Sequence, residues 1–161
     1  MRRTENLRRP LGTLLLTALG TCGLMSPALG SPGSGVTPTN YVTATLGEDV
    51  QGNHDKIKFQ TKDPTVVRVQ KLEFAPGGYT GFHHHPGVVI VSIASGSLNL
   101  VDTSCATETY SAGSVFVESD DHAHQAVSPN GATVYVTYIV PAGNPPSFRE
   151  EEQVPFCATK F

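Results

Sequence analysis

The sequence predicts a single all-β domain of the sandwich or barrel type, and two observations carry this prediction. From Tyr41 onward, short runs rich in β-branched and aromatic residues alternate with Gly- and Pro-containing turn signals about every 8–12 residues. No stretch places apolar residues at helical spacing behind a capping residue. The predicted strands are Lys56–Phe59, Thr65–Phe74, Gly81–His85, Val88–Ala94, Ser97–Val101, Val115–Glu118, Gln125–Val127 and Thr133–Val140.

Two of the breaks between these runs are predicted hairpin turns. Asn130 and Gly131 suit a turn whose two central residues take positive φ angles. Gly96 can do the same after Ser95, because glycine has no Cβ to clash. Each turn would connect two neighbouring antiparallel strands.

The first 30 residues have the pattern of an export signal. Four arginines within the first nine residues precede an apolar run, Leu11–Leu24, which is short for a membrane span. Ala28 and Gly30 then supply the small residues of a cleavage site. The sequence therefore predicts a secreted or extracytoplasmic protein with no integral membrane segment after cleavage.

Two details of export stay open. Arg8 and Arg9 resemble a twin-arginine signal, so the general secretory route and the twin-arginine route are both compatible with the sequence. The segment ending at Cys22 resembles a lipoprotein box, but Thr21 fits poorly before the cysteine. A lipid anchor at Cys22 is therefore the less favoured alternative.

Removal of the signal changes the charge of the chain. Residues 1–30 contain 4 of the 11 basic residues and 1 of the 14 acidic residues, which leaves 7 minus 13, a net charge near −6. Nucleic acids and anionic lipids bind clustered positive charge. This balance argues against both as partners.

The cysteine count agrees with export. After removal of the signal, two cysteines remain, Cys105 and Cys157. A pair in an oxidising compartment is typical of a disulfide, and it would tie the C-terminal tail to the domain. The predicted organisation is a signal peptide at 1–30, a Pro/Gly-rich flexible linker at 31–40, the domain at 41–143 and a loop-like tail at 144–161.

Histidines form two pairs with the same spacing. In a strand, residues i and i+2 face the same side, so His83 and His85 can point at one place while His84 points elsewhere. His122 and His124 form a second such pair, after the predicted strand Val115–Glu118. Imidazole is a common ligand of transition metals, although a single pair of this kind is more often surface decoration.

Two motifs resemble those of the cupin superfamily. Gly77-x5-His83-x-His85, followed by Gly96, is similar to the first cupin motif, and Gly113 followed by His124 is similar to the second. The resemblance covers roughly residues 74–140 and is to small exported bacterial members with a single domain. It implies an antiparallel jelly-roll β-barrel with a metal held inside by His83, His85 and His124, and it allows a homodimer.

The chain also departs from the family. The glutamate ligand of the first motif falls on Val89, or on Ile90 with a longer spacing, and neither side chain has a donor atom. Glu118 and His122 are the candidates to replace it. A set of three imidazoles suits Fe, Zn, Cu or Ni, and makes Mn less favoured because the carboxylate is missing.

Three functions remain in competition. The first is a metal-dependent enzyme, an oxygenase, lyase or isomerase acting on a small anionic molecule; no general acid or base is evident for it in the sequence. The second is a barrel that binds a metal or small metabolite without chemistry. The third is a barrel that has lost metal binding, with the histidines as polar packing.

Overall fold

The computed structural model describes residues 32–47, 50–118, 122–143 and 146–155. Within these ranges the regular elements are all strands, which confirms the all-β prediction. No helix there is long and apolar enough to cross a membrane. The strands are β1 (Ser34–Leu46), β2 (Gln51–His54), β3 (Ile57–Gln60), β4 (Thr65–Tyr79), β5 (His83–His84), β6 (Val88–Asp102), β7 (Thr107–Ser111), β8 (Val115–Glu118), β9 (His124–Ser128), β10 (Ala132–Pro141) and β11 (Glu150–Glu151).

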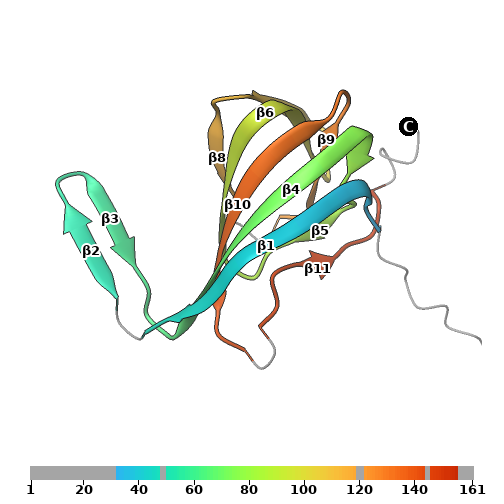
Figure 1. The fold of residues 1–161 in the computed structure, drawn as a ribbon. Coiled ribbons are helices and arrows are strands. Elements are labelled where there is room, and N and C mark those ends of the chain that lie inside the picture. Colours follow the sequence, from blue (N-terminus) through green and yellow to red (C-terminus); the bar gives the residue numbers. More distant parts are fainter. Residues whose placement is uncertain (1–31, 48–49, 119–121, 144–145, 156–161) are drawn as a thin grey trace, which may run out of the picture.

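The strands form an antiparallel barrel (Figure 1). The main sheet has the order β1-β4-β10-β6-β9-β5-β11, and β7 and β8 also pair with β6. A further pairing joins β4 to β9, at Gly78 opposite Ser128 and Tyr79 opposite Val127. This pairing closes the ring β4-β10-β6-β9, because each of these strands is hydrogen-bonded to the next and the last returns to the first.

The core lies inside this ring. It consists of aliphatic and aromatic side chains that alternate along the strands with outward-facing ones, as the two-residue period of a strand requires. Phe82, Val89, Leu98, Val134 and Val140 have almost no exposed surface. The interior is therefore apolar, and the polar side chains buried in it need a specific partner or role.

The predicted hairpin turn at Ser95-Gly96 is wrong. β6 runs unbroken from Val88 to Asp102 and spans two of the predicted strands. Gly96 does take a positive φ of 73°, but a Cβ there would lie 2.1 Å from the carbonyl oxygen of Gly131 on the neighbouring segment. The glycine allows two backbones to approach closely while the strand continues, so it marks a bend and not a turn.

The turn at Asn130-Gly131 exists but does not make a hairpin. Gly131 has a φ of 89°, as predicted for a turn. However, the two strands that it joins do not pair: β9 pairs with β4, β5 and β6, and β10 pairs with β4 and β6. The chain crosses here between non-adjacent strands of the barrel. Local turn chemistry identifies the reversal but not the strands that follow it.

The segment predicted as a flexible linker is largely a strand. β1 begins at Ser34, inside the interval 31–40, and pairs with β4 from Ser34 opposite Tyr79 to Leu46 opposite Thr65. A proline is compatible with this position because β1 is an edge strand, whose outer N–H groups have no ladder partner to lose. The composition of this segment does not indicate a strand, because β1 is stabilised by backbone pairing with β4 and most of its side chains are exposed.

The tail also contains regular structure. β11 pairs with β5, with Glu150 opposite His84 and Glu151 opposite His83. The predicted loop-like tail is therefore wrong for this segment, which lies beside the strand carrying the first histidines (Figure 1). The predicted signal peptide and Cys157 lie outside the described residues, so the signal and the disulfide with Cys105 stay predictions.

Candidate metal centre

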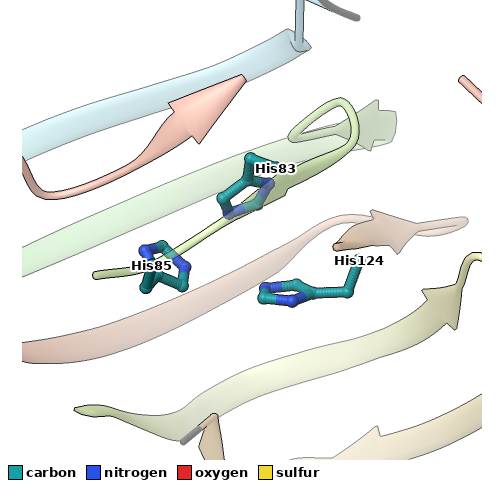
Figure 2. Close-up of side chains that lie close together, drawn as sticks. All are labelled: His83, His85 and His124. Atoms are coloured by element: carbon teal, nitrogen blue, oxygen red, sulfur yellow. The ribbon is translucent and has the colours of Figure 1, made fainter. Parts of the chain in front are cut away.

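Three of the predicted histidines meet inside the barrel. His83, His85 and His124 are all buried, and a ligand nitrogen of each lies within 4.8 Å of those of the other two. Their rings are neighbours, with centroids 4.7–5.4 Å apart. Figure 2 shows the first two on the segment of β5 and the third at the start of β9, facing them. Residues 39 to 41 positions apart are thus brought together by the direct pairing of His83 with His124.

The alternation of a strand explains which histidines converge. His83 and His85 turn inward, and His84 between them points the other way, as predicted. His84 lies between two tail carboxylates, with Nε2 3.3 Å from Glu150 and Nδ1 2.9 Å from Glu152. Phe82, with no exposed surface, anchors the segment in the core.

Each of the three buried imidazoles is oriented by a backbone carbonyl. Nδ1 of His83 lies 2.9 Å from the oxygen of Gly81, Nδ1 of His124 lies 3.0 Å from that of His122, and Nδ1 of His85 lies 2.6 Å from that of Phe148. A carbonyl oxygen can only accept, so each Nδ1 carries the hydrogen. The neutral rings therefore keep a lone pair on Nε2, which is the tautomer that a metal ligand needs.

A carboxylate completes the cluster. Glu118, the last residue of β8, places Oε2 3.3 Å from Nε2 of His85 and Oε1 3.2 Å from Nε2 of His124. Its cross-strand partner on β6 is Val89, the position where the first motif would carry its glutamate. Cross-strand partners point to the same face of a sheet. An acidic side chain therefore lies at this level of the barrel, but on β8 and not at position 89 of β6, where the first motif would place it.

The pKa values reflect this mutual arrangement. Burial raises the pKa of Glu118, but its interactions with His124 and then His85 outweigh burial and lower it to about 2. Burial tends to lower the pKa of His124, but Glu118 outweighs it and raises that pKa. For His83, burial and then the charge of Arg149 lower the pKa to about 3. At neutral pH, Glu118 is therefore an anion and His83 is a neutral imidazole.

The residues present fit a transition metal ion. Among the described residues, Nε2 of His124 has no hydrogen-bond partner of good geometry, although it is buried and 3.2 Å from Glu118. In a tetrahedral site with bonds of about 2.0–2.1 Å, neighbouring ligand atoms are about 3.3–3.4 Å apart. The two distances from Glu118 to imidazole nitrogens, 3.2 and 3.3 Å, match this spacing. The group that could hold an ion is the three histidines, whose ligand atoms lie within 4.8 Å of one another, with the Glu118 carboxylate beside two of them.

A segment of the tail holds one side of the site. We call residues 146–152 the strap. In addition to the Phe148 carbonyl, the backbone N–H of Glu152 donates to Phe82, and Nη2 of Arg149 donates to the carbonyl of Thr80. The guanidinium of Arg68 lies 3.5 Å from the centre of the Phe148 ring, a cation–π contact. The role of Phe148 beside His85 has no signal in the sequence, because the contact is made by its backbone carbonyl.

Tyr138 is a second residue that sequence reasoning missed. On β10 it lies opposite Val89, and its ring is 5.6 Å from that of His85. Its hydroxyl donates to Oε1 of Gln70 at 3.2 Å. Burial, and then the charge of Glu118, raise the pKa of Tyr138 to about 12, so the hydroxyl keeps its proton and acts as a donor.

The other candidate ligand, His122, has a different role in the structure. Its side chain is exposed, and it is not in the group of converging histidines among the described residues. Its backbone carbonyl instead orients His124. Of the two candidates to replace the missing glutamate, the structure therefore brings Glu118, and not His122, into the cluster.

An antiparallel β-barrel with histidines from two distant segments meeting inside is the arrangement expected of a cupin. No protein-family profile matches the chain, and no curated protein matches it. Solved structures do match. A cupin domain from Bordetella pertussis Tohama I is 20% identical, with 69% of this chain and 97% of that chain covered and a TM-score of 0.45.

Two other matches cover less of this chain. An RmlC-like cupin from Shewanella frigidimarina NCIMB 400 is 19% identical, with 48% of this chain and 69% of that chain covered and a TM-score of 0.43. A sugar phosphate isomerase of the cupin superfamily from Silicibacter pomeroyi DSS-3 is 25% identical, with 44% and 48% covered and a TM-score of 0.40. The three matches thus cover between 44% and 69% of this chain.

Proposed function

We propose that this protein binds one divalent transition metal ion through Nε2 of His83, His85 and His124 and a carboxylate oxygen of Glu118. The observation that carries the proposal is the buried set of three imidazoles whose Nδ1 atoms are all tied to backbone carbonyls. Hydrogen-bonded orientation of this kind is typical of histidines that ligate a metal.

The donor set supports a choice of metals. Three imidazoles suit Fe, Zn, Cu or Ni. With Glu118 as a fourth ligand, the protein also supplies one negative charge, so the reason for placing Mn below the others becomes weaker. When bound, such an ion acts as a Lewis acid and lowers the pKa of a bound water.

The enzymatic hypothesis rests on what the chain's own residues do around the site. The ring of Tyr138 lies 5.6 Å from that of His85 while its hydroxyl donates to Gln70, and apolar side chains of the barrel surround the site. These are features of a reactive centre in which an oxygenase, lyase or isomerase reaction of a small molecule could occur. We infer that the protein is a metal-dependent enzyme. The alternative is a barrel that binds a metal or small metabolite without catalysis.

One observation favours the alternative that metal binding has been lost. Glu118 lies within 3.3 Å of both His85 and His124, so a protonated imidazole and the carboxylate could satisfy each other without an ion. The two possibilities differ in metal content. We expect about one equivalent of a transition metal in protein purified without chelators or reconstituted after chelation.

Variants sharpen this test. Replacement of His83, His85 or His124 by Ala should each abolish stoichiometric binding, measured by elemental analysis after gel filtration. His84→Ala is the matched control, because His84 faces away from the cluster, and it should retain the metal. Less than about a tenth of an equivalent in the reconstituted parent protein would contradict the proposal.

A further inference from the structure

The cavity inside the barrel is too small for an organic molecule. It has a volume of about 30 Å³ and is lined by His83, His85, Glu118, Tyr138 and apolar core residues. A water needs about 10–15 Å³ of such space, whereas pockets for small organic ligands begin at about 300 Å³. An organic substrate that enters the barrel therefore needs a neighbouring part of the chain to move.

The strap is held beside this cavity by few backbone bonds. The strands β4, β10 and β6 pair along long continuous ladders, whereas the strap pairs with β5 at two residues only, Glu150 and Glu151 (Figure 1). Its other bonds to the barrel are those of the Phe148 carbonyl, the Arg149 side chain and the Glu152 N–H. A segment with few such bonds opens at a lower free energy than the barrel ladders do.

The strap covers an arginine at the mouth of the barrel. Arg68 on β4 is half-buried and is the cross-strand partner of Tyr138 on β10. Tyr138 is in turn the partner of Val89, and Val89 that of Glu118. Cross-strand partners point to the same face, so these four residues form one row on the inner face. The Phe148 ring lies on this row, with its centre 3.5 Å from the guanidinium carbon of Arg68 and 5.8 Å from the centre of the Tyr138 ring.

The guanidinium of Arg68 has donors to spare. Within the described residues, its Nε donates to the hydroxyl of Thr43 at 3.1 Å, and no carboxylate pairs with it. A guanidinium carries five N–H donors in a planar fork that matches the two oxygens of a carboxylate. The Phe148 ring offers it only a cation–π contact, which is weaker than a charge-assisted bidentate pair. A carboxylate would therefore bind this fork more strongly than the ring does.

We propose that Arg68 binds the carboxylate of a small organic acid, which takes the place of the Phe148 ring when the strap opens. This inference rests on the proposed metal function and names a substrate class for it. The acid lies beside Tyr138, and its far end points along the row toward the histidine cluster. The sequence led to an anionic substrate only through the charge of the ion, and Arg68 adds a residue that recognises the anion.

The test uses the full chain reconstituted with zinc and two probes of the same shape, the anion pyruvate and the neutral pyruvamide. Their dissociation constants are measured by NMR titration, and the zinc content of each sample is determined in parallel. We expect Arg68→Met to weaken pyruvate at least about tenfold, through loss of the charge-assisted pair, and pyruvamide less than about twofold. Lys71→Gln is the matched control and should change neither constant, because Lys71 lies on the outward face of the same strand and pairs with Glu73.

Two further measurements test the exchange of Phe148 for the ligand. Phe148→Ala removes the competing ring and keeps the backbone carbonyl that orients His85, so it should strengthen pyruvate about two- to fivefold. Saturating pyruvate should also accelerate chymotrypsin cleavage after Phe148 at least about tenfold, because cleavage follows the population of the open strap. Pyruvamide should not accelerate it, and pyruvate should lose this effect in Arg68→Met.

The outcomes separate the carboxylate site from the metal function. With one equivalent of zinc bound, equal losses for pyruvate and pyruvamide in Arg68→Met, or no binding of pyruvate to the parent protein, would overturn the site and leave the metal function intact. Weaker pyruvate binding in Phe148→Ala, or slower cleavage with pyruvate, would overturn the exchange. A parent protein that fails to bind zinc would overturn the proposed function, while a preference for pyruvate that Arg68→Met abolishes would still support the site at Arg68.

Discussion

Replacement of Glu118 by glutamine tests the part of the site that the family motif does not supply. Glutamine keeps the shape of the side chain and removes its charge. A pKa lowered from 4.5 to about 2 corresponds to about 3 kcal/mol of net stabilisation of the carboxylate, in which the two imidazoles outweigh the opposing effect of burial. A divalent ion at the same place carries more charge than a shared proton. We therefore expect Glu118→Gln to weaken metal binding by at least about 100-fold.

The assay is competition with a chromophoric chelator at pH 7.5, which gives the metal dissociation constant directly. Glu73→Gln is the matched control, since Glu73 is exposed and pairs with Lys71 on β4, away from the cluster. It should leave the constant unchanged. If Glu118→Gln bound metal as tightly as the parent protein, with folding intact by circular dichroism, the carboxylate would not be a ligand and the reasoning would fail.

Three other predictions follow from the same geometry. In Glu118→Gln, a second change of Val89→Glu should recover at least about tenfold in metal affinity, because these cross-strand partners share a face; no recovery would place position 89 out of reach. A chain ending at Gly143, which lacks the strap, should bind metal about 10–100-fold more weakly by the same competition assay, whereas a chain ending at Pro155 should not; equal loss in both would refute the strap's role. Without metal, the urea-unfolding free energy should fall by about 1.4 kcal/mol per pH unit between about pH 6 and pH 4.5, because unfolded His83 takes up a proton and the folded residue, with its pKa lowered to about 3, does not; over this range the slope should vanish in His83→Asn.

The pH prediction has a defined window. A lowered folded pKa means that the stabilisation from a neutral His83 is present above about 6.5 and lost as the pH falls toward 3. Glu118 adds a second loss in the same direction below about pH 4.5, where the unfolded carboxyl begins to protonate. The raised pKa of His124 stabilises the folded protein fully below about pH 6.5. This stabilisation is lost as the pH rises from there through the folded pKa of His124.

The convergence of the histidines could be predicted because it depends on local rules and one motif. Strand alternation separates His84 from its neighbours, and the motif spacing pairs that segment with His124. Glu118 could only be named as one of two candidates. Its place opposite Val89 depends on the pairing of β8 with β6, a non-local register that a short strand does not encode by itself.

The role of the strap could not be predicted from the sequence. The residue that orients His85 is Phe148, and it does so with a backbone carbonyl that every residue type possesses. Similarly, β1 is held by backbone pairing to β4 at the edge of the sheet. Backbone pairing does not require apolar side chains, so the composition of β1 resembles that of a linker. Gly96 carries the positive φ of a turn but serves a close approach to Gly131.

The extended fine structure of the X-ray absorption spectrum of the bound metal tests the central claim most directly. In the reconstituted protein we expect scattering from three imidazole rings and one oxygen ligand at about 2.0–2.2 Å, with the oxygen contribution reduced in Glu118→Gln. A spectrum with fewer than three imidazoles, or an ion bound only by oxygen, would contradict a centre built from His83, His85, His124 and Glu118.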